Sequence, residues 1–180
     1  KETGINSSSI GYGLGVVVAD INMDGYPDLY IGNDFHENDY LYINQRNGTF
    51  KESIEEQIGH TPLSSMGSDI ADLNNDGWQD IIVTEMFPES EERVKRTATY
   101  ESYDFFQFKL KQDYYYQYMR NMVHINNGDG TFSEMGQQLG LHATDWSWGG
   151  LIFDADNDGL SDLYVCNGIY HDVTDQDFID

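Results

Sequence analysis

The stretch Asp20-Ile21-Asn22-Met23-Asp24-Gly25-Tyr26-Pro27-Asp28 occurs in three versions along this chain, with the same spacing of acidic residues each time. The second version lies at 72–80 and the third at 154–162. A glycine stands five residues before each version, and an apolar residue follows directly after it. Such self-similarity is typical of a chain built from repeated structural units. We therefore infer three repeats.

Each acidic stretch lies between two short runs of apolar residues. Val16-Val17-Val18-Ala19 precedes the first stretch, and Leu29-Tyr30-Ile31 follows it. Short runs rich in β-branched and aromatic residues, bounded by Gly and Asp, predict strands. A third strand is expected at 40–43, and the Asn47-Gly48 pair predicts a hairpin turn into a fourth strand at 49–51. Four antiparallel strands in about 50 residues are typical of a β-propeller blade.

A second marker shows that the middle repeat is longer than the first. Ile43-Asn44, followed by Gly48-Thr49-Phe50, reappears at 125–126 and 130–132. The second copy of this marker lies much farther from its acidic stretch than the first copy does. Extra sequence is therefore inserted in the second repeat, at about 88–121. The predicted fold is all-β, a β-propeller segment of about three four-stranded blades with one mainly helical or irregular insertion. We expect the blades at about 10–55, 62–136 and 144–180, with the Tyr-rich insertion 88–121 in the second. Three blades do not close a propeller, which predicts a piece of a larger one.

The acidic stretches have the composition of calcium-binding loops. Ca²⁺ takes six to eight oxygen ligands, and a glycine permits the sharp turn that brings alternate side chains together. The expected ligands of the three sites are the side chains of Asp20, Asn22, Asp24 and Asp28 with the carbonyl of Tyr26; those of Asp72, Asn74, Asp76 and Asp80 with the carbonyl of Trp78; and those of Asp154, Asp156, Asp158 and Asp162 with the carbonyl of Leu160.

Two alternatives to these sites can be weighed from the sequence. An EF-hand needs a glutamate at the twelfth loop position and helices on both sides, but Ile31, Val83 and Val165 stand there and the flanks read as strands. Turns rich in Asp, Asn and Gly are also common without metal. Three loops with the same spacing of ligands favour three calcium sites over ordinary turns, and the third, with four carboxylates, is expected to bind most tightly.

Composition narrows the range of partners. The chain carries 32 acidic and nine basic residues and a formal net charge of −23. Such a surface repels phosphate groups, so no nucleic-acid partner is expected. No run of about eighteen apolar residues occurs, so no transmembrane segment is expected in this chain. The single cysteine, Cys166, lies in a strand-like run and is predicted to be a small buried residue.

The pattern of apolar strand, Asp-x-Asn/Asp-x-Asp-Gly-x-x-Asp and apolar strand resembles the FG-GAP/VCBS repeats of integrin α-type β-propellers. Two segments look closer to VCBS-repeat proteins of the UnbV/cartilage-acidic-protein type: the one that runs from 146–150 to 167–168, and the one at 126–132. The long Tyr-rich insertion is similar to that of the Bacteroidota branch of these proteins. The resemblance implies a seven-bladed or similar propeller, calcium loops that rigidify blade hairpins, and a location outside the cytoplasm. It does not imply one activity.

The insertion departs from the blade pattern. Residues 89–96 are charged and open with acidic residues, which predicts a helix. The stretch from 100 to 118 is crowded with aromatic side chains, which either pack the insertion onto its own propeller or form an exposed surface for a protein or glycan partner. The residues of this possible partner surface are Tyr100, Tyr103, Phe105, Phe106, Tyr114, Tyr115, Tyr116 and Tyr118.

We identify no catalytic residues in the sequence. The five histidines are dispersed, neither Gly-x-Ser-x-Gly nor His-Glu-x-x-His occurs, and the chain is not expected to be an enzyme. Asp69 and Glu85 fall on strands that would line a propeller channel, where carboxylates could bind a cation or act as acid and base. A solvated surface is the simpler interpretation of both.

These features together predict a calcium-binding, extracytoplasmic β-propeller segment that serves as a protein- or glycan-recognition scaffold. One alternative is a part of an extracellular carbohydrate-active enzyme, such as a polysaccharide lyase. Another is a structural subunit of an outer-membrane complex, whose other subunits would then be partners. The expected location is extracellular, at the cell surface or associated with the outer membrane. Millimolar calcium outside the cell would fill weak sites that cytosolic calcium leaves empty.

Overall fold

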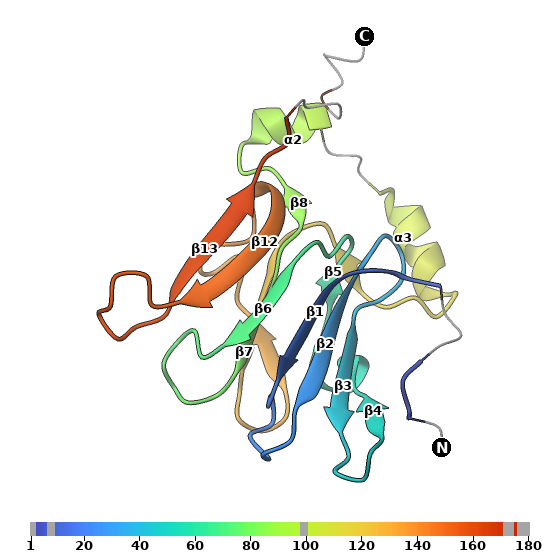
Figure 1. Cartoon of the computed structure of the whole chain (residues 1–180). Coiled ribbons are helices and arrows are strands. Elements are labelled where there is room, and N and C mark those ends of the chain that lie inside the picture. The colour runs from blue at the N-terminus through green and yellow to red at the C-terminus, as the bar shows by residue number, and fades with distance from the viewer. Residues whose placement is uncertain (1–2, 7–9, 98–100, 171–174, 176–180) are drawn as a thin grey trace.

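The computed structural model describes residues 3–6, 10–97, 101–170 and 175, and it consists mainly of antiparallel sheets stacked side by side (Figure 1). The first sheet has four strands in chain order: β1 (Tyr12–Ala19), β2 (Asp28–Asp34), β3 (Tyr40–Asn44) and β4 (Phe50–Glu52). The second sheet has the same arrangement: β6 (Ser68–Ala71), β7 (Asp80–Val83), β10 (Met122–Asn126) and β11 (Phe132–Glu134). Both sheets confirm the predicted meander of four strands.

The third sheet is smaller. It contains β12 (Asp145–Phe153), β13 (Asp162–Asn167) and the short strand β8 (Met86–Phe87), which pairs with the first residues of β12. Within the described residues no further strand pairs with β13. The three sheets form an open series, as expected for blades that do not close a ring. The all-β fold class is confirmed.

The segment between β7 and β10 is a mixture of short helices and irregular chain, as predicted. It contains α2 (Glu91–Thr97), α3 (Tyr103–Leu110) and β9 (Gln117–Tyr118), and β9 pairs in parallel with β5 (Thr61–Pro62). Ser102 caps α3 by accepting a hydrogen bond from the Phe105 amide, and α2 opens with acidic residues and ends with basic ones. One further helical turn, α1 (Ile54–Gln57), follows β4. No described helix is long and apolar enough to cross a membrane.

Two side-chain hydrogen bonds help to connect the insertion to the rest of the chain. Arg93 of α2 donates through Nη2 to Asp145 of β12 at 3.0 Å. The Tyr115 hydroxyl donates to the Ile58 carbonyl oxygen at 2.6 Å. Within the insertion, buried Lys109 of α3 pairs with Glu101 at 2.8 Å, and this partner offsets the cost of burying the lysine charge. The insertion therefore packs partly onto its own sheets.

The core lies between adjacent sheets rather than within one of them. A cluster between the first two sheets includes Tyr30, Leu41, Ile70, Ile81 and Val83, all buried. A second cluster between the last two sheets is built from the following residues: Ile82, Val123, Ile152, Ala71, Leu73, Ile125, Leu141 and Leu163. Because neighbouring residues of a strand point to opposite faces, the middle sheet packs against both of its neighbours.

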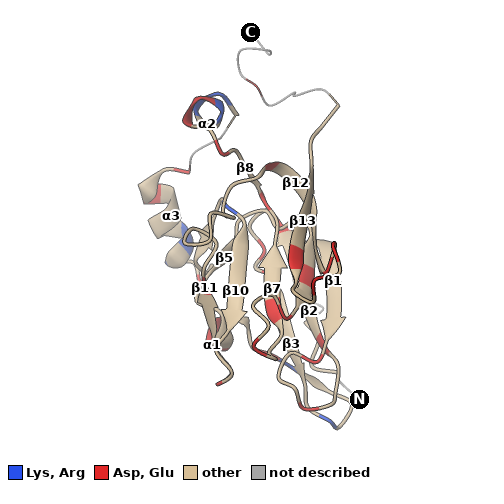
Figure 2. Cartoon of the chain, turned by 90° about the vertical axis from the view of Figure 1, so that its left-hand side faces the viewer, with Lys and Arg blue, Asp and Glu red and all other residues tan. Residues whose placement is uncertain are grey.

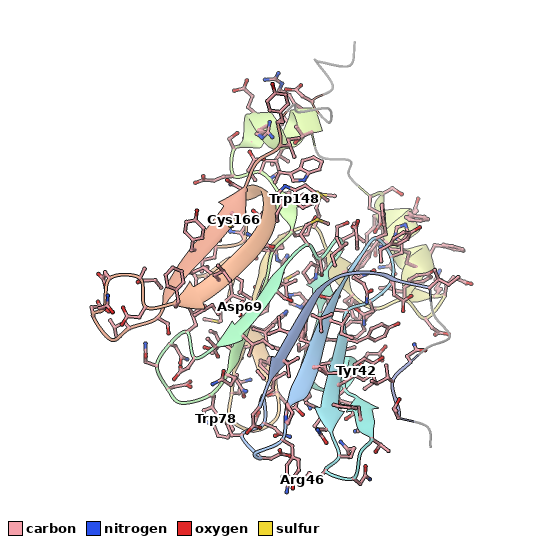
Figure 3. The ribbon with its side chains drawn as sticks, viewed as in Figure 1. Tyr42, Arg46, Asp69, Trp78, Trp148 and Cys166 are labelled. Atoms are coloured by element: carbon pink, nitrogen blue, oxygen red, sulfur yellow. The ribbon has the colours of Figure 1, made fainter. Side chains whose placement is uncertain are left out.

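The outer faces of the first and third sheets are exposed and apolar. On β1 the alternate residues Val16 and Val18 are 63% and 60% exposed, and on the third sheet Leu151 and Tyr164 are 52% and 57% exposed. Cys166, on the edge strand β13, is also exposed, so the prediction that it is buried was wrong (Figure 3). Its run of apolar neighbours suggested a covered strand, but no described segment packs over it.

Two buried or half-buried carboxylates connect the sheets. Asp39 is fully buried and accepts hydrogen bonds from the Tyr30 hydroxyl at 2.6 Å, the Asn33 amide at 2.8 Å and the Ser65 hydroxyl at 2.7 Å. Asp69 of β6 accepts a hydrogen bond from the Ile152 amide of β12 at 2.7 Å. Polar groups in such places are stabilised because each carboxylate finds donors.

Candidate metal centre in the acidic loops

The three acidic loops connect β1 to β2, β6 to β7 and β12 to β13, and they project from the edge opposite to α2 (Figure 1). Figure 2 shows acidic residues on most parts of the ribbon, and both acidic and basic residues on α2. Each loop begins with an aspartate at the end of one strand and finishes with another at the start of the next, so each loop joins a pair of hydrogen-bonded neighbours. The strands therefore fix the two ends of every loop.

The three loops share one set of hydrogen bonds. In the first loop Asp20 accepts from the Asp24 amide at 2.9 Å through Oδ1 and from the Gly25 amide at 2.7 Å through Oδ2. The Asp24 amide also donates to Asn22 Oδ1 at 3.1 Å, and the Tyr26 amide donates to Asp24 Oδ1 at 2.9 Å. The second and third loops repeat these contacts at 2.8–3.1 Å, so the backbone holds the side-chain oxygens in one arrangement.

The backbone of each loop turns through left-handed residues. Gly25, Gly77 and Gly159 have φ of 88°, 94° and 88°, a left-handed conformation that confirms the sharp turn predicted at these glycines. The residue two places earlier is also left-handed in every loop: Met23, Asn75 and Asn157 have φ of 56°, 59° and 62°. Sequence reasoning missed this second position, because asparagine tolerates that conformation but methionine gives no such signal.

The last aspartate of a loop anchors it to the sheet. Asp28 is buried and accepts from the Ile21 amide at 3.0 Å and the Asn44 amide at 2.7 Å. Asp80 makes the matching contacts with Leu73 and Asn126. Burial raises the pKa of both carboxyls, although these backbone hydrogen bonds oppose the shift. A nearby divalent cation would favour the ionised form of both groups.

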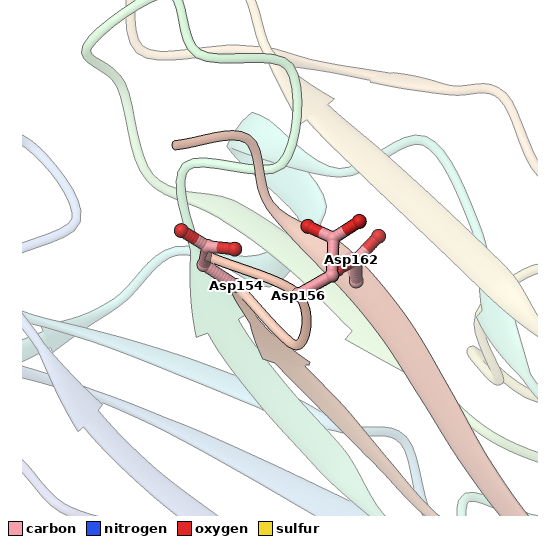
Figure 4. Close-up of side chains that lie close together, drawn as sticks. All are labelled: Asp154, Asp156 and Asp162. Carbon is pink, nitrogen blue, oxygen red and sulfur yellow. The ribbon is translucent and has the colours of Figure 1, made fainter. Parts of the chain in front are cut away.

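The third loop brings its carboxylates closest together. Asp154, Asp156 and Asp162 each offer an oxygen within 4.8 Å of the others (Figure 4). Two oxygens bound to the same Ca²⁺ at 2.3–2.6 Å can be at most about 5 Å apart, so this group has the dimensions of a calcium site. Asp162 is exposed, and among the described residues no hydrogen bond reaches its Oδ1. This oxygen remains available to a ligand, and the loop fits the ion.

A basic side chain from outside the first loop contacts that loop. Arg46, from the β3–β4 turn, donates through Nε to Asp24 Oδ2 at 2.9 Å, and its guanidinium lies 5.7 Å from the centre of the Tyr26 ring (Figure 3). Partial burial raises the pKa of the Asp24 carboxyl, but the hydrogen bonds from Arg46 and the Tyr26 amide outweigh it and bring the pKa below its usual value. In the second loop Asn74 Nδ2 donates to Asp76 Oδ2 at 2.8 Å instead.

Each of the first two loops also accepts a hydrogen bond from a residue of the following blade. Asn126 Nδ2 of the second sheet donates to the Ile21 carbonyl of the first loop at 3.2 Å. Ser161 Oγ of the third loop donates to the Asp72 carbonyl of the second loop at 2.7 Å. Because these contacts involve loop backbone, the conformation of one loop is coupled to the position of the next blade.

Neither carboxylate flagged as a possible channel group has the environment of a catalytic pair. Asp69 links the second sheet to the third, because it accepts the hydrogen bond from the Ile152 amide. Glu85 is 1% exposed, so a solvated surface is the wrong interpretation for this residue. Burial raises the pKa of Glu85 to about 8, and its Oε2 has no hydrogen-bond partner among the described residues. The predicted solvation failed because the residue is buried by distant parts of the chain, and its amide donates to Asn121 Oδ1 at 2.7 Å.

The aromatic residues of the insertion are divided between surface and interior. Tyr103, Phe105, Tyr114, Tyr116 and Tyr118 are 37–74% exposed, whereas Phe106 and Tyr115 are half-buried. Tyr100 lies outside the described residues. The ring of Phe106 lies 5.8 Å from that of Tyr118, and both line a cavity of about 480 Å³ together with the following residues: Leu63, Phe87, Glu101, Tyr103, Gln117 and Met119. Sequence reasoning found the aromatic residues but not this cavity.

Comparison with known families agrees with the repeats described above. Residues 20–83 and 111–165 match the model of the FG-GAP-like repeat, and together these ranges include more than half of the chain. The chain belongs to the FG-GAP-like repeat family. A segment of this FG-GAP-like chain is 37% identical over 84 residues to integrin alpha-7 of Homo sapiens, which covers 41% of the chain and 7% of the integrin. The chain thus spans a small part of the length of that relative.

Proposed function

We propose that this chain is a calcium-stabilised recognition scaffold that works outside the cytoplasm. The observation that carries the calcium assignment is the carboxylate group of the third loop, whose oxygens fit one Ca²⁺, together with the same backbone geometry in the other two loops. Membership of the FG-GAP-like family and the similarity to an integrin α chain support an extracellular or cell-surface role.

In this proposal three ions occupy the three loops. The ligands are the side chains at loop positions one, three, five and nine and the carbonyl oxygen at position seven: Asp20, Asn22, Asp24, Asp28 and Tyr26; Asp72, Asn74, Asp76, Asp80 and Trp78; Asp154, Asp156, Asp158, Asp162 and Leu160. The ten carboxylates of these loops repel one another when no cation is present. Calcium would neutralise them and stabilise the turn between the first two strands of each blade.

The blade boundaries of the proposal are about 10–55, 62–136 and 144–180, with the insertion at 88–121. They are supported by the alternating cores, since the middle sheet buries one face against each neighbour. The exposed apolar faces of the outer sheets have the character of blade surfaces that pack against further blades of a longer propeller.

We propose the insertion as the recognition surface. It exposes several large aromatic side chains, and the cavity beside Phe106 and Tyr118 adds two polar groups, Glu101 and Gln117, to an apolar lining. Aromatic residues with a polar tip are enriched at protein interfaces and also stack on sugar rings. A protein or a glycan is therefore the class of partner proposed, and the exposed Tyr103 is the residue to replace first.

Calcium removal tests the scaffold. Thermal unfolding of the chain, measured with 1 mM calcium and then with excess EDTA, is expected to show a fall in melting temperature of about 5 °C or more, because an ion that binds only the folded state stabilises it. Asp156→Ala removes one carboxylate of the third loop and should reduce the calcium-dependent shift. Asp104→Ala, at the exposed start of α3, removes a carboxylate far from any loop and should not. An identical melting temperature with and without calcium would reject the assignment.

Partner binding tests the recognition surface. Screening the chain against immobilised glycans and against extracellular and cell-surface proteins should yield a partner whose binding falls with Tyr103→Ala. Tyr164→Ala, at an exposed tyrosine of the third sheet, is the matched control. Equal binding by both variants would place recognition elsewhere on the molecule.

A further inference from the structure

The three acidic loops share their backbone but differ at one oxygen of the fifth residue. Oδ2 of Asp24 accepts a hydrogen bond from Arg46 at 2.9 Å. Oδ2 of Asp76 accepts from the uncharged amide of Asn74. In the part of the chain that the structure describes, no donor reaches Oδ2 of Asp158. Among the described residues, only the first of the three loops has a basic side chain hydrogen-bonded to its fifth residue.

Arg46 occupies a position where the other complete blade has a glycine. Its counterpart in the second blade is Gly128, and the two residues have left-handed φ of 58° and 71°. Both amides donate to the asparagine side chain two residues earlier, Asn44 at 2.9 Å and Asn126 at 3.0 Å, so the two turns have the same backbone. A left-handed backbone disfavours residues with a Cβ. Arginine thus occupies a position whose backbone conformation glycine would adopt with less strain.

We propose that Arg46 is a built-in competitor of calcium at the first loop, and that it makes this loop the weakest of the three sites. The inference rests on the calcium sites of the proposed function. A calcium ligand lies 2.3–2.6 Å from the ion, so an ion bound by Asp24 would lie within about 5 Å of a guanidinium on the same carboxylate. Like charges at that distance repel, and the ion either displaces Arg46 or binds against its charge.

The charges of the loops set the order of affinity. The third loop has four carboxylates, the second has three, and the first has three that Arg46 partly neutralises. Calcium should therefore fill the third loop first and the first loop last. As calcium falls, the β1–β2 turn would lose its ion before the other two, and the arginine would take over part of the role of the ion by holding Asp24. The first loop is then the calcium-responsive one.

The test is a calcium titration of the ¹⁵N-labelled chain followed by NMR. The amides of Gly25, Gly77 and Gly159 report one loop each, because each donates to the first aspartate of its own loop. In the wild type the Gly25 signal should reach its midpoint at the highest calcium concentration. Arg46→Gln should lower the Gly25 midpoint about ten-fold, the scale expected for removing one charge a few ångströms from a divalent ion in an exposed site. The other two midpoints should stay within about two-fold.

Three further variants separate charge from structure. Arg46→Lys keeps the charge and should leave the Gly25 midpoint close to that of the wild type. Arg46→Gly reproduces the residue of the second blade in the same backbone conformation and should behave like Arg46→Gln. Lys51→Gln removes an equal charge from the same hairpin, where Lys51 pairs with Glu56, and should change no midpoint.

The outcomes distinguish this proposal from the proposed function. If all three glycine signals respond to calcium but Arg46→Gln leaves the Gly25 midpoint unchanged, the competitor role is wrong while the calcium sites stand. If the midpoint rises instead, Arg46 orients Asp24 for the ion, and the proposal is also overturned. If no glycine signal responds at millimolar calcium, the calcium assignment itself fails and takes this inference with it.

Discussion

Replacing Tyr30 by phenylalanine removes one hydroxyl from the interface between the first two sheets without changing the shape of the core. Tyr30 and Asp39 are both 0% exposed, and their hydrogen bond is 2.6 Å long. A hydrogen bond to a charged group contributes about 1.5–3 kcal/mol, because its loss leaves a buried acceptor short of one donor. We expect Tyr30→Phe to lower the free energy of unfolding by about 2 kcal/mol at pH 8 and the melting temperature by about 4–8 °C.

The pH dependence of this loss follows from Asp39. Burial raises the pKa of its carboxyl to about 6, although Tyr30, Asn33 and Ser65 donate hydrogen bonds to it. An acid whose pKa is higher in the folded than in the unfolded protein stabilises the fold below its unfolded pKa, about 4, and this contribution disappears as the pH rises through 6. Removing the Tyr30 hydroxyl raises the pKa further. The loss should therefore be larger at pH 8 than at pH 4.5, where the folded carboxyl is protonated.

Urea unfolding at pH 8 and pH 4.5, followed by tryptophan fluorescence, measures both effects. Tyr164→Phe is the matched control, because Tyr164 occupies the same position of the third repeat but is 57% exposed. Its effect should stay below about 0.5 kcal/mol. The reasoning is refuted if Tyr30→Phe costs less than about 0.5 kcal/mol at pH 8, or if its cost is the same at both pH values.

Three further predictions concern packing, titration and reactivity. Gly67→Ala should destabilise the chain by about 1–3 kcal/mol in urea unfolding, because a Cβ there would lie 2.6 Å from the Trp148 carbonyl oxygen, whereas Gly149→Ala, at the matching position of the third repeat with no atom within 4 Å, should change stability little. Burial lowers the pKa of His124 to about 3, so its contribution to stability is present above pH 6.5 and is lost as the pH falls toward 3. The free energy of unfolding of the wild type should therefore fall between pH 7 and pH 5, and His124→Gln should make this fall smaller by about 2 kcal/mol. An equal fall in the variant and the wild type would contradict this. Cys166 should react with a thiol reagent in the native protein at the rate of an exposed cysteine, and protection until unfolding would show that this strand is covered in solution.

Much of the fold follows from the sequence because the repeats constrain one another. The strand pair around each acidic loop, the hairpin after Asn44 and the helix in 89–96 were all predicted, since each depends on local spacing and turn chemistry. The strands of two residues, β5, β8 and β9, were missed, because so short a run shows no periodicity. The sequence also could not show which sheet covers which face, and the environments of Cys166 and Glu85 were wrong for that reason.

In the candidate site, too, the features set by local sequence were predictable and the contacts between distant residues were not. The glycines of the loops and their left-handed conformation were predictable, since the turn requires them. The contact between Arg46 and Asp24 was not, because the two residues are 22 positions apart and meet only when the β3–β4 turn folds back beside the loop. The cavity beside Phe106 depends on how α3 lies against β9, which no local pattern specifies.

The bonds from Asn126 to the Ile21 carbonyl and from Ser161 to the Asp72 carbonyl have a thermodynamic consequence. Each blade is coupled to its immediate neighbour through the backbone of a loop, so the stability of the array is approximately a sum of blade energies and nearest-neighbour terms. If the interaction energies between neighbouring blades are weakened, unfolding should begin at a terminal blade and advance one blade at a time. An ion that stiffens one loop would also raise the cost of separating the blade beyond it, and fraying from the ends would become cooperative.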